Sequence, residues 1–421
     1  MSLDPKYGEG FLRLDKDRCR SLAEILPMSA SALPEVKMDV WALLEQHWGI
    51  FGGSEAEKPD KSGCIVLDNP GWISAGGTVL SAVQSYLVSR GVRPRNTNVV
   101  ITSTLDSGLM VELPRALSEE IEELGCHVST HVPSRSEEVV SIGQTASYST
   151  PVELDRTYVE SDVRIVIASA RPSLITGVSA GPVSILPGLA AERSRIKNRR
   201  LALGNMGLLS TDTPCARDAV ECAIMAGPCL AVNSIPDWTG NCTKLIVGSP
   251  ESAWCDDLNS CRGLAEASIP RLFDIAVVSA GGTPRDLTLY DSVDALAAGV
   301  AATRRDGVVV LVTECSQGCG PDGFLRGVSE NSSSSEVLLS SELRYLEGME
   351  KAWYFWRVLE SRRVVLCTRL RAGMVVERLH SEHVKDPDEG VEVALTIAGQ
   401  DSTVAVIPDG GSTVPVLGRG M

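Results

Sequence analysis

Histidine is scarce in this sequence, which has five histidines among 421 residues. Because imidazole is the usual acid–base group near neutral pH and a common metal ligand, this shortage restricts both kinds of site. The sequence also lacks a GxGxxG run after an expected strand and a GxxxxGKS/T motif. It therefore offers neither a dinucleotide fingerprint nor a P-loop.

Long apolar runs are missing as well. No stretch approaches the roughly 18 apolar residues of a membrane-spanning helix. The N-terminal MSLDPKYGEG has no apolar core of the kind found in signal peptides. We therefore expect a cytoplasmic protein without a transmembrane helix.

The twelve cysteines form no CxxC pair, which argues against a structural zinc site. Cys215, Cys222 and Cys229 recur every seven residues, and we expect them to be small buried thiols in a reducing compartment. A nucleophilic Cys315 or Cys319 would need a nearby base, and no histidine is close in the sequence. The sequence predicts no metal site.

Basic residues are outnumbered, with 39 Lys and Arg against 54 Asp and Glu, for a net charge of −15. Nucleic acids and membrane surfaces bind clustered positive charge, so neither is an expected partner. A small anionic ligand remains possible, and the sequence leaves the oligomeric state open. Hydrophobic residues make up 43% and charged residues 22%, which is typical of a globular chain with a real core.

Short apolar runs alternate with helical segments along most of the chain. Strands are expected at 64–67, 98–101, 163–168, 275–279, 308–313, 364–366 and 404–407, and helices at 78–89, 114–124, 214–227, 291–303 and 347–359. This alternation predicts an α/β fold of two domains with mostly parallel sheets and a cleft between them. We expect domains at 1–265 and 266–403, followed by a C-terminal tail at 404–421. The serine-rich stretch 329–341 is predicted to be a polar loop.

Ligands of open α/β sheets bind beyond the carboxyl ends of the strands. The loops in that position are 68–71, 102–106, 171–190, 279–286 and 314–322. Gly281 and Gly282 follow a strand, where backbone N–H groups can approach an anion. A tight strand-to-helix corner explains the same pair of glycines.

Several of these loops resemble one family when taken in order. The segment DIAVVSAGGTPRDLTLY at 274–290 is similar to the start of the C-terminal domain of the nickel-pincer lactate racemase family. The opening YGEG at 7–10 resembles that family's YGxG. The SAG at 179–181 and ILPG at 185–188 resemble its SGGRK and LPG loop, and IPDGG at 407–411 resembles its C-terminal end. The loops at 68–72 and 102–106 stand where the family has DxTRP-like and TGTHR motifs.

The resemblance implies two α/β domains that hold a nickel-pincer nucleotide in the cleft. In that family a loop lysine is joined covalently to the cofactor, a histidine ligates nickel, and two histidines act as acid and base. The implied activity is racemisation or epimerisation of 2-hydroxy acids, which makes the family one of isomerases.

This sequence departs from the family's pattern at its functional positions. The two acid–base histidines correspond to Leu105 and Ser173, the lysine to Val183, the nickel-ligand histidine to Arg199, the first-loop arginine to Gly71, and a glutamine and a lysine to Asp291 and Asp294. Valine cannot form the lysine linkage, and an arginine that is always charged does not ligate a metal. Leucine and serine cannot exchange protons as imidazole does.

These departures predict a diverged member of the family without the nickel-pincer nucleotide. Two alternatives stay open, a non-catalytic protein that binds a small anion or acts as a scaffold, and a different cofactor-independent enzyme that uses cleft carboxylates. Whether the chain is an enzyme is therefore also open. The acid–base candidates for the second alternative are Asp106, Asp291, Asp294 and Glu314.

The residues expected to contact a ligand are Asp68, Asn69, Thr102, Ser103, Thr104, Arg171, Ser173, Ser179, Gly181, Arg199, Gly281, Gly282, Arg285 and Tyr290. For Arg171, Arg199 and Arg285, ion pairing with neighbouring aspartates is an equal alternative to anion binding. For His131 the sequence leaves two alternatives, a functional role and packing at the edge of a strand. His380 and His383 lie in an acidic stretch and are expected on a solvated surface.

Overall fold

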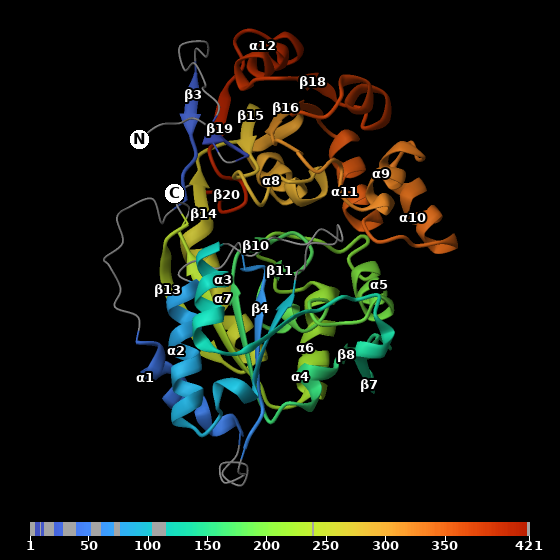
Figure 1. Cartoon of the computed structure of the whole chain (residues 1–421). Helices are drawn as coiled ribbons and strands as arrows, with labels where there is room; N and C mark the ends of the chain where they lie inside the picture. Colours follow the sequence, from blue (N-terminus) through green and yellow to red (C-terminus); the bar gives the residue numbers. More distant parts are fainter. Residues whose placement is uncertain are drawn as a thin grey trace.

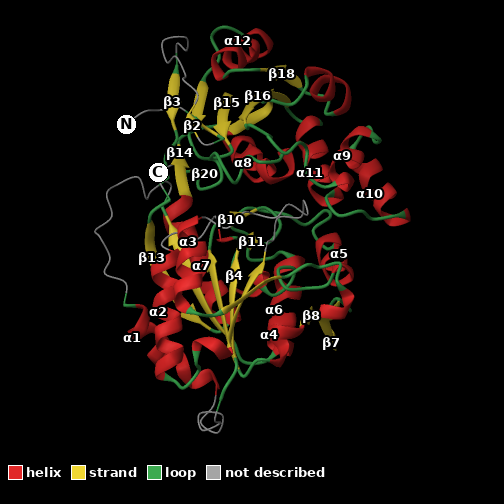
Figure 2. Ribbon diagram, viewed as in Figure 1, coloured by secondary structure: helices red, strands yellow, loops and turns green. Residues whose placement is uncertain are grey.

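The computed structural model describes residues 5–8, 10–11, 21–27, 39–51, 60–70, 76–102, 115–237 and 240–418. The chain forms two stacked halves, each built around a six-stranded sheet (Figure 1). Figure 2 shows helices on both faces of the two sheets. This arrangement confirms the predicted fold class, an α/β fold with mostly parallel strands.

The first sheet lies in the lower half of Figure 1. Its strands, in spatial order, are β13 (Cys242–Gly248), β12 (Leu230–Pro236), β9 (Val163–Ser169), β4 (Gly63–Asp68), β5 (Thr97–Thr102) and β6 (His127–Thr130). β13 is antiparallel to β12, and the other neighbouring strands are parallel.

Alternation along β4 explains how helices cover both faces of this sheet. Ile65 and Leu67 point to one face, and Cys64 and Val66 point to the other. The first face packs against α1 (Val40–His47), α2 (Gly76–Ser89) and α3 (Arg115–Leu124), and the second against α4 (Arg156–Glu160), α6 (Pro214–Ala226) and α7 (Pro250–Ala265). Both faces of β4 are therefore buried, as its continuous apolar run predicts.

The second sheet is wholly parallel. Its strands, in order, are β18 (Glu382–Val384), β17 (Arg363–Cys367), β16 (Thr303–Val312), β15 (Phe273–Ser279), β19 (Val404–Ile407) and β3 (Leu22–Glu24). One face is covered by α12 (Pro387–Ala398), and the other by α8 (Leu289–Ala302), with α9 (Asp322–Ser329) and α11 (Met349–Leu359) in the same core.

Both ends of the described chain contribute to the second half. β3 lies at the edge of the second sheet beside β19, although the sequence analysis assigned it to the first domain. β19, assigned to a C-terminal tail, lies inside the sheet between β15 and β3. The chain passes from the first half to the second through β14 (Glu266–Ile269). This strand pairs with β20 (Val414–Leu417).

The remaining elements are short. Three antiparallel ribbons are β1 (Lys6–Tyr7) with β2 (Gly10–Phe11), β7 (Val139–Gln144) with β8 (Pro151–Asp155), and β10 (Pro172–Ser173) with β11 (Gly177–Val178). The other helical segments are η3 (Trp48–Phe51), η6 (Pro94–Asn96), η7 (Ser136–Glu138), η8 (Gly181–Ser184), α5 (Glu192–Arg200), α10 (Ser334–Leu343) and η9 (Met374–Arg378).

The prediction of a polar loop at 329–341 is wrong, because α10 occupies much of it. Ser333 caps this helix by accepting a hydrogen bond from the Glu336 N–H at 3.2 Å. The Glu336 carboxylate in turn accepts from the Ser332 N–H at 2.7 Å. These contacts form a helix-start motif like the capping box, which outweighs the low helix propensity of the serines. Among the described residues, no helix has both the length and the apolar character needed to cross a membrane.

Candidate functional site

A cavity of about 80 Å³ lies between the two halves. Arg171, Ala280 and Gly411, which follow the ends of β9, β15 and β19, all line it, so it sits at the carboxyl edge of both sheets. The complete lining is Arg171, Pro172, Ser173, Ile175, Thr176, Ser179, Val183, Arg199, Ala280, Arg285, Tyr290, Asp291, Asp294, Ala295, Lys351 and Gly411.

Arg285 is held at the edge of this cavity by Asp409. Its Nη2 lies 2.7 Å from Asp409 Oδ2, and its Nη1 donates to Ser412 Oγ at 2.9 Å. Burial alone would raise the pKa of Asp409, but the cations Arg285 and Lys6 lower it. A Cβ on Gly281 would lie 2.7 Å from atoms of both Arg285 and Asp409, so this position requires glycine. Arg285 therefore forms an ion pair, but with Asp409, which is distant in the sequence, and not with the neighbouring aspartates that the sequence analysis considered.

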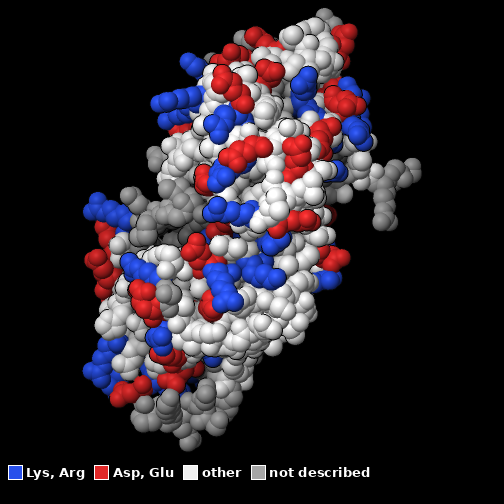
Figure 3. All heavy atoms as spheres, turned by 90° about the vertical axis from the view of Figure 1, so that its right-hand side faces the viewer, with Lys and Arg blue, Asp and Glu red and all other residues white. Residues whose placement is uncertain are grey.

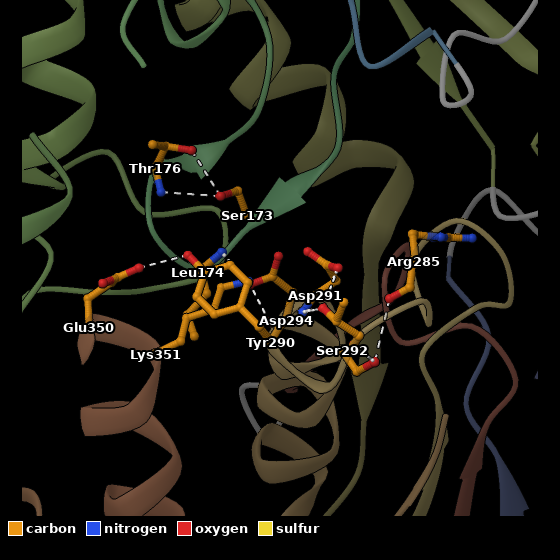
Figure 4. Close-up of polar contacts among 11 residues, drawn as sticks. Ser173, Leu174, Thr176, Arg285, Tyr290, Asp291, Ser292, Asp294, Glu350 and Lys351 are labelled. Atoms are coloured by element: carbon orange, nitrogen blue, oxygen red, sulfur yellow. Dashed lines mark hydrogen bonds and ion pairs between the residues drawn. The ribbon is translucent and has the colours of Figure 1, made fainter. Parts of the chain in front are cut away.

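Tyr290 and Lys351 form a second wall of the cavity (Figure 4). The Tyr290 hydroxyl donates to Glu350 Oε1 at 2.7 Å, and the Tyr345 hydroxyl donates to Glu350 Oε2 at 2.5 Å. Lys351 Nζ donates to the Tyr290 carbonyl at 3.1 Å and lies 4.5 Å from the centre of the Tyr290 ring. Since Glu350 is fully buried, these contacts fix the positions of Tyr290 and Lys351.

Asp291 and Asp294 project from the beginning of α8 toward the β10–β11 ribbon (Figure 4). Asp291 Oδ2 accepts from the Thr288 hydroxyl at 2.5 Å. Asp294 Oδ1 lies 3.2 Å from Lys351 Nζ and 3.3 Å from the Leu174 N–H, so it connects the two halves. Asp291 lies in the first turn of α8, where the helix dipole favours negative charge.

Arg171 and Arg199 bring positive charge from the lower half. Burial and, to a smaller extent, the neighbouring Arg285 lower the pKa of Arg171 to about 9. Arg199 is 6% exposed and comes from α5. A bound anion would stabilise the charged form of Arg171, because it would offset both burial and the second cation.

Another ion pair joins the halves beside the cavity. Arg195 Nη2 lies 3.0 Å from Glu347 Oε1, and both side chains are largely buried. Together with the contact between Leu174 and Asp294, this pair holds the two halves in the arrangement that closes the cavity.

The structure brings part of the predicted site together at this cavity. The candidates that line it are Arg171, Ser173, Ser179, Arg199, Arg285, Tyr290, Asp291 and Asp294. Gly181, Gly281 and Gly282 belong to the adjoining loops and have positive φ values of 60°, 100° and 74°. Ser103, Thr104 and Asp106 lie outside the described residues.

Other candidates face elsewhere. Glu314 does not line the cavity, because its carboxylate pairs with Arg369 at 2.5 Å. Asp68 is buried at the end of β4 and accepts from Ser184 Oγ at 2.7 Å and from Asn69 Nδ2 at 2.9 Å. The Thr102 hydroxyl donates to the Gly188 carbonyl. Asp68, Asn69 and Thr102 therefore hold the neighbouring loop in place.

None of the five histidines lines the cavity. His131 is buried between Asp155 and the Ala190 carbonyl, which is a structural position. His380 is exposed and stacks on Trp356, with ring centres 5.0 Å apart. In the part of the chain that the structure describes, no three His, Cys, Asp or Glu side chains gather as metal ligands would.

The cysteines near the second sheet are unreactive. Burial raises the pKa of Cys315 to about 12 and that of Cys319 to about 11. Both are therefore thiols at neutral pH, which excludes a ready thiolate nucleophile at these two positions.

The sequence analysis missed Lys351 and Thr176. Thr176 Oγ1 lies 2.9 Å from Ser173 Oγ on the ribbon above the carboxylates. A signal for Lys351 exists in hindsight, because Glu350 and Lys351 are adjacent charged residues on the apolar face of α11. Charged residues at such positions are rarely buried unless paired.

Comparison with known proteins points to one family over most of the chain. The family model of the lactate racemase N-terminal domain matches residues 7–207, and that of the lactate racemase C-terminal domain matches residues 270–415. The lactate racemase of Thermoanaerobacterium thermosaccharolyticum is 27% identical over 331 residues, covering 76% of each chain. The lactate racemase of Lactiplantibacillus plantarum is 27% identical over 311 residues, covering 71% of this chain and 72% of its own.

Two solved structures share the fold. The lactate racemase apoprotein from T. thermosaccharolyticum superimposes with a TM-score of 0.76 at 22% identity, covering 99% of this chain and 100% of its own. A protein from Thermotoga maritima superimposes with a TM-score of 0.68 at 13% identity, covering 92% of this chain and 100% of its own.

Proposed function

This chain belongs to the lactate racemase family, and we propose that it is a diverged member that binds a small carboxylic acid without the nickel-pincer nucleotide. One observation carries the proposal. Val183 and Arg199, which stand where the family has its lysine and its nickel-ligand histidine, both line the cavity between the halves.

The residues present do not fit the nickel-pincer nucleotide. Val183 is 3% exposed and has no amine with which to join a cofactor. Arg199 carries a guanidinium, which offers donors only and no lone pair to a metal. No histidine lines the cavity to replace the missing ligand.

The charges support a small carboxylic acid as the ligand. Arg171 and Arg199 can donate paired hydrogen bonds to a carboxylate, the geometry that guanidinium groups favour. The cavity of about 80 Å³ is well below the 300–1,000 Å³ of pockets that hold drug-sized ligands, so the ligand would be small.

The absence of the cofactor can be tested directly. We expect the chain, produced together with the cofactor-synthesis enzymes, to keep its unmodified intact mass and to contain only substoichiometric nickel. The lactate racemase of T. thermosaccharolyticum, produced in the same cells, serves as the positive control. A covalent mass increase on this chain with stoichiometric nickel would overturn the proposal.

Anion binding has its own test. The Arg199→Met substitution is expected to weaken lactate binding by roughly tenfold or more in calorimetry, because a charge-assisted hydrogen bond contributes about 1.5–3 kcal/mol. Arg171→Met should have a similar effect, which guards against a folding defect in either variant. Arg200→Met changes the exposed neighbour on the same helix and should leave binding unchanged. Equal binding by all four proteins would contradict the proposal.

A second function remains worth testing, namely a cofactor-independent enzyme that uses cleft carboxylates. It is favoured by Asp291 and Asp294 lying side by side in the cavity, where one could accept a proton that the other or Tyr290 returns. Exchange of the C2 hydrogen of lactate for solvent deuterium, lost in Asp291→Asn, would support this function. A complete lack of exchange at high protein concentration would exclude it.

The eleven cysteines among the described residues are all free. Free thiols persist in reducing compartments, so we propose that the protein acts in the cytoplasm.

A further inference from the structure

We propose that the ligand of the cavity carries an ammonium group as well as a carboxylate, as a small α-amino acid does. This inference rests on the proposed function, since it refines the ligand of the same cavity. It starts from the lining, which carries the carboxylates of Asp291 and Asp294 as well as the cations Arg171, Arg199, Arg285 and Lys351. A ligand with negative charge alone would complement only part of that surface.

The two carboxylates face the space that a ligand would occupy. Asp291 and Asp294 are three residues apart on α8, so they share one face of the helix. Both point toward the ribbon that carries Ser173 and Thr176 (Figure 4). Asp291 contacts Thr288, and Asp294 contacts Leu174 and Lys351. An ionised carboxylate has about four lone-pair sites, so it can accept hydrogen bonds from several donors at once.

The four cations that line the cavity come from both halves of the molecule. Lys351 is paired with Asp294 at 3.2 Å, and Arg285 is paired with Asp409 at 2.7 Å. Arg171 and Arg199 come from the opposite half of the molecule, on the segments after β9 and in α5. Basic groups of the lower half therefore face acidic groups of α8 across one small cavity.

The same mixture of signs extends over the outside of the molecule. Figure 3 shows Lys and Arg interspersed with Asp and Glu on the face that carries α5, α10 and α11. The view shows no broad field of one sign there. Long-range attraction of a simple anion is therefore weak on this side, and recognition depends on the local pairs in the cavity.

A zwitterion can pair with both the basic and the acidic side chains of the cavity. Its carboxylate can receive N–H groups from Arg171 and Arg199, while its ammonium donates to Asp291 and Asp294. A 2-hydroxy acid offers one neutral O–H to the two aspartates, and a simple carboxylate offers none. Charge-assisted hydrogen bonds are about twice as strong as neutral ones, so an amino acid is expected to bind roughly tenfold more tightly than the matching hydroxy acid.

Three ligands with the same carbon skeleton separate these cases. Alanine, lactate and propionate differ only in the group on C2, and each enantiomer of the first two is measured by calorimetry. We expect alanine to bind roughly tenfold more tightly than lactate, and lactate at least as tightly as propionate. Asp291→Asn should remove the preference for alanine and leave lactate binding in place. The cap of α8 is retained, because in it Thr288 Oγ1 accepts from the backbone N–H of residue 291, and the asparagine oxygen can still accept from the Thr288 hydroxyl.

Asp294→Asn provides an independent variant, since its amide oxygen can still accept from the Leu174 N–H. Asp322→Asn changes an exposed acid in the first turn of α9 and is the matched control, which should keep the preference. Equal or tighter binding of lactate would overturn the ammonium proposal while leaving carboxylate binding intact. If none of the three ligands binds the wild-type chain, both proposals fall.

Discussion

Replacing His131 with alanine is expected to lower the free energy of unfolding by about 3 kcal/mol, because it leaves two buried acceptors without their partner, at about 1–3 kcal/mol each. The His131 side chain is 1% exposed. Its Nδ1 lies 3.0 Å from Asp155 Oδ2, and its Nε2 lies 3.1 Å from the Ala190 carbonyl oxygen. Alanine would leave the buried Asp155 carboxyl and the buried Ala190 carbonyl without these contacts.

The His131→Ala substitution should also disturb the local structure around Asp155. The Asp155 Oδ1 atom caps α4 by accepting from the Tyr158 N–H at 3.2 Å, while Oδ2 holds His131. His131 thus links the end of β6 to the start of α4 and to the loop that closes the cavity. In a double-mutant cycle with Asp155→Ala, the combined loss should be smaller than the sum of the single losses.

His127→Ala is the matched control for this prediction. His127 is the exposed first residue of β6, the strand that ends just before His131, so its replacement should change stability by less than about 0.5 kcal/mol. Urea unfolding of both variants at one pH gives the comparison. A loss for His131→Ala no larger than that for His127→Ala would refute the structural role of the pair.

Strands buried on both faces were predictable from the sequence, because each is a short continuous apolar run. The runs at β4, β5, β9, β15, β16 and β19 are of this kind. β3 is only three residues long, and its partner β19 lies about 380 residues further along the chain. Nothing in the local pattern of Leu22–Glu24 indicates that pairing, so its place in the second sheet was missed.

α10 shows a different reason for a missed element. Its residues are rich in serine, and composition predicted a loop at 329–341. The helix depends on local contacts, in which Ser334 also pairs with Glu360 at the end of α11. Ser333 followed by Glu336 was a helix-start signal in the sequence, and the polar composition concealed it.

The position of the candidate site could be predicted from the strand ends, but the side chains that line it could not all be predicted. Arg171 and Arg285 were expected near one cleft because each follows a strand end, and Asp291 was expected there from the family resemblance. All three line the cavity. Glu314 also follows a strand, but its side chain turns to Arg369 instead. The direction of a side chain and the choice of an ion-pair partner depend on tertiary packing, which the sequence pattern does not contain. Lys351 was missed for the same reason, since it reaches the cavity from a helix.

Asp68 makes the stability of this protein depend on pH in an unusual direction. It is buried at the end of β4, and its carboxyl contacts Ser184 and Asn69. Burial raises the pKa of Asp68 from 3.8 to about 6, although the Ser184 hydrogen bond and the charge of Arg199 act in the opposite sense. The folded protein therefore holds this proton more tightly than the unfolded chain does.

The sign of the effect follows from proton binding. Between pH 4 and pH 6 the folded state keeps the proton and the unfolded state has released it, so raising the pH favours unfolding. The contribution of Asp68 is fully present below pH 3.8 and is lost as the pH rises through about 6. One pKa unit corresponds to about 1.4 kcal/mol, so the loss amounts to about 3 kcal/mol.

Asp68→Asn should remove this dependence, because asparagine resembles the protonated carboxyl and can still form hydrogen bonds with Ser184 and Asn69. The stability of Asp68→Asn relative to wild type is expected to rise by about 3 kcal/mol from pH 4 to pH 7 in urea unfolding. Asp274→Asn is the control, because the hydrogen bonds from Thr403 and Arg304 lower the pKa of Asp274 to about 2. Its effect should be constant between pH 5 and pH 7, where Asp274 is ionised in both states. A difference between Asp68→Asn and wild type that stays constant over the whole range would show that the Asp68 carboxyl is ionised in the folded protein throughout.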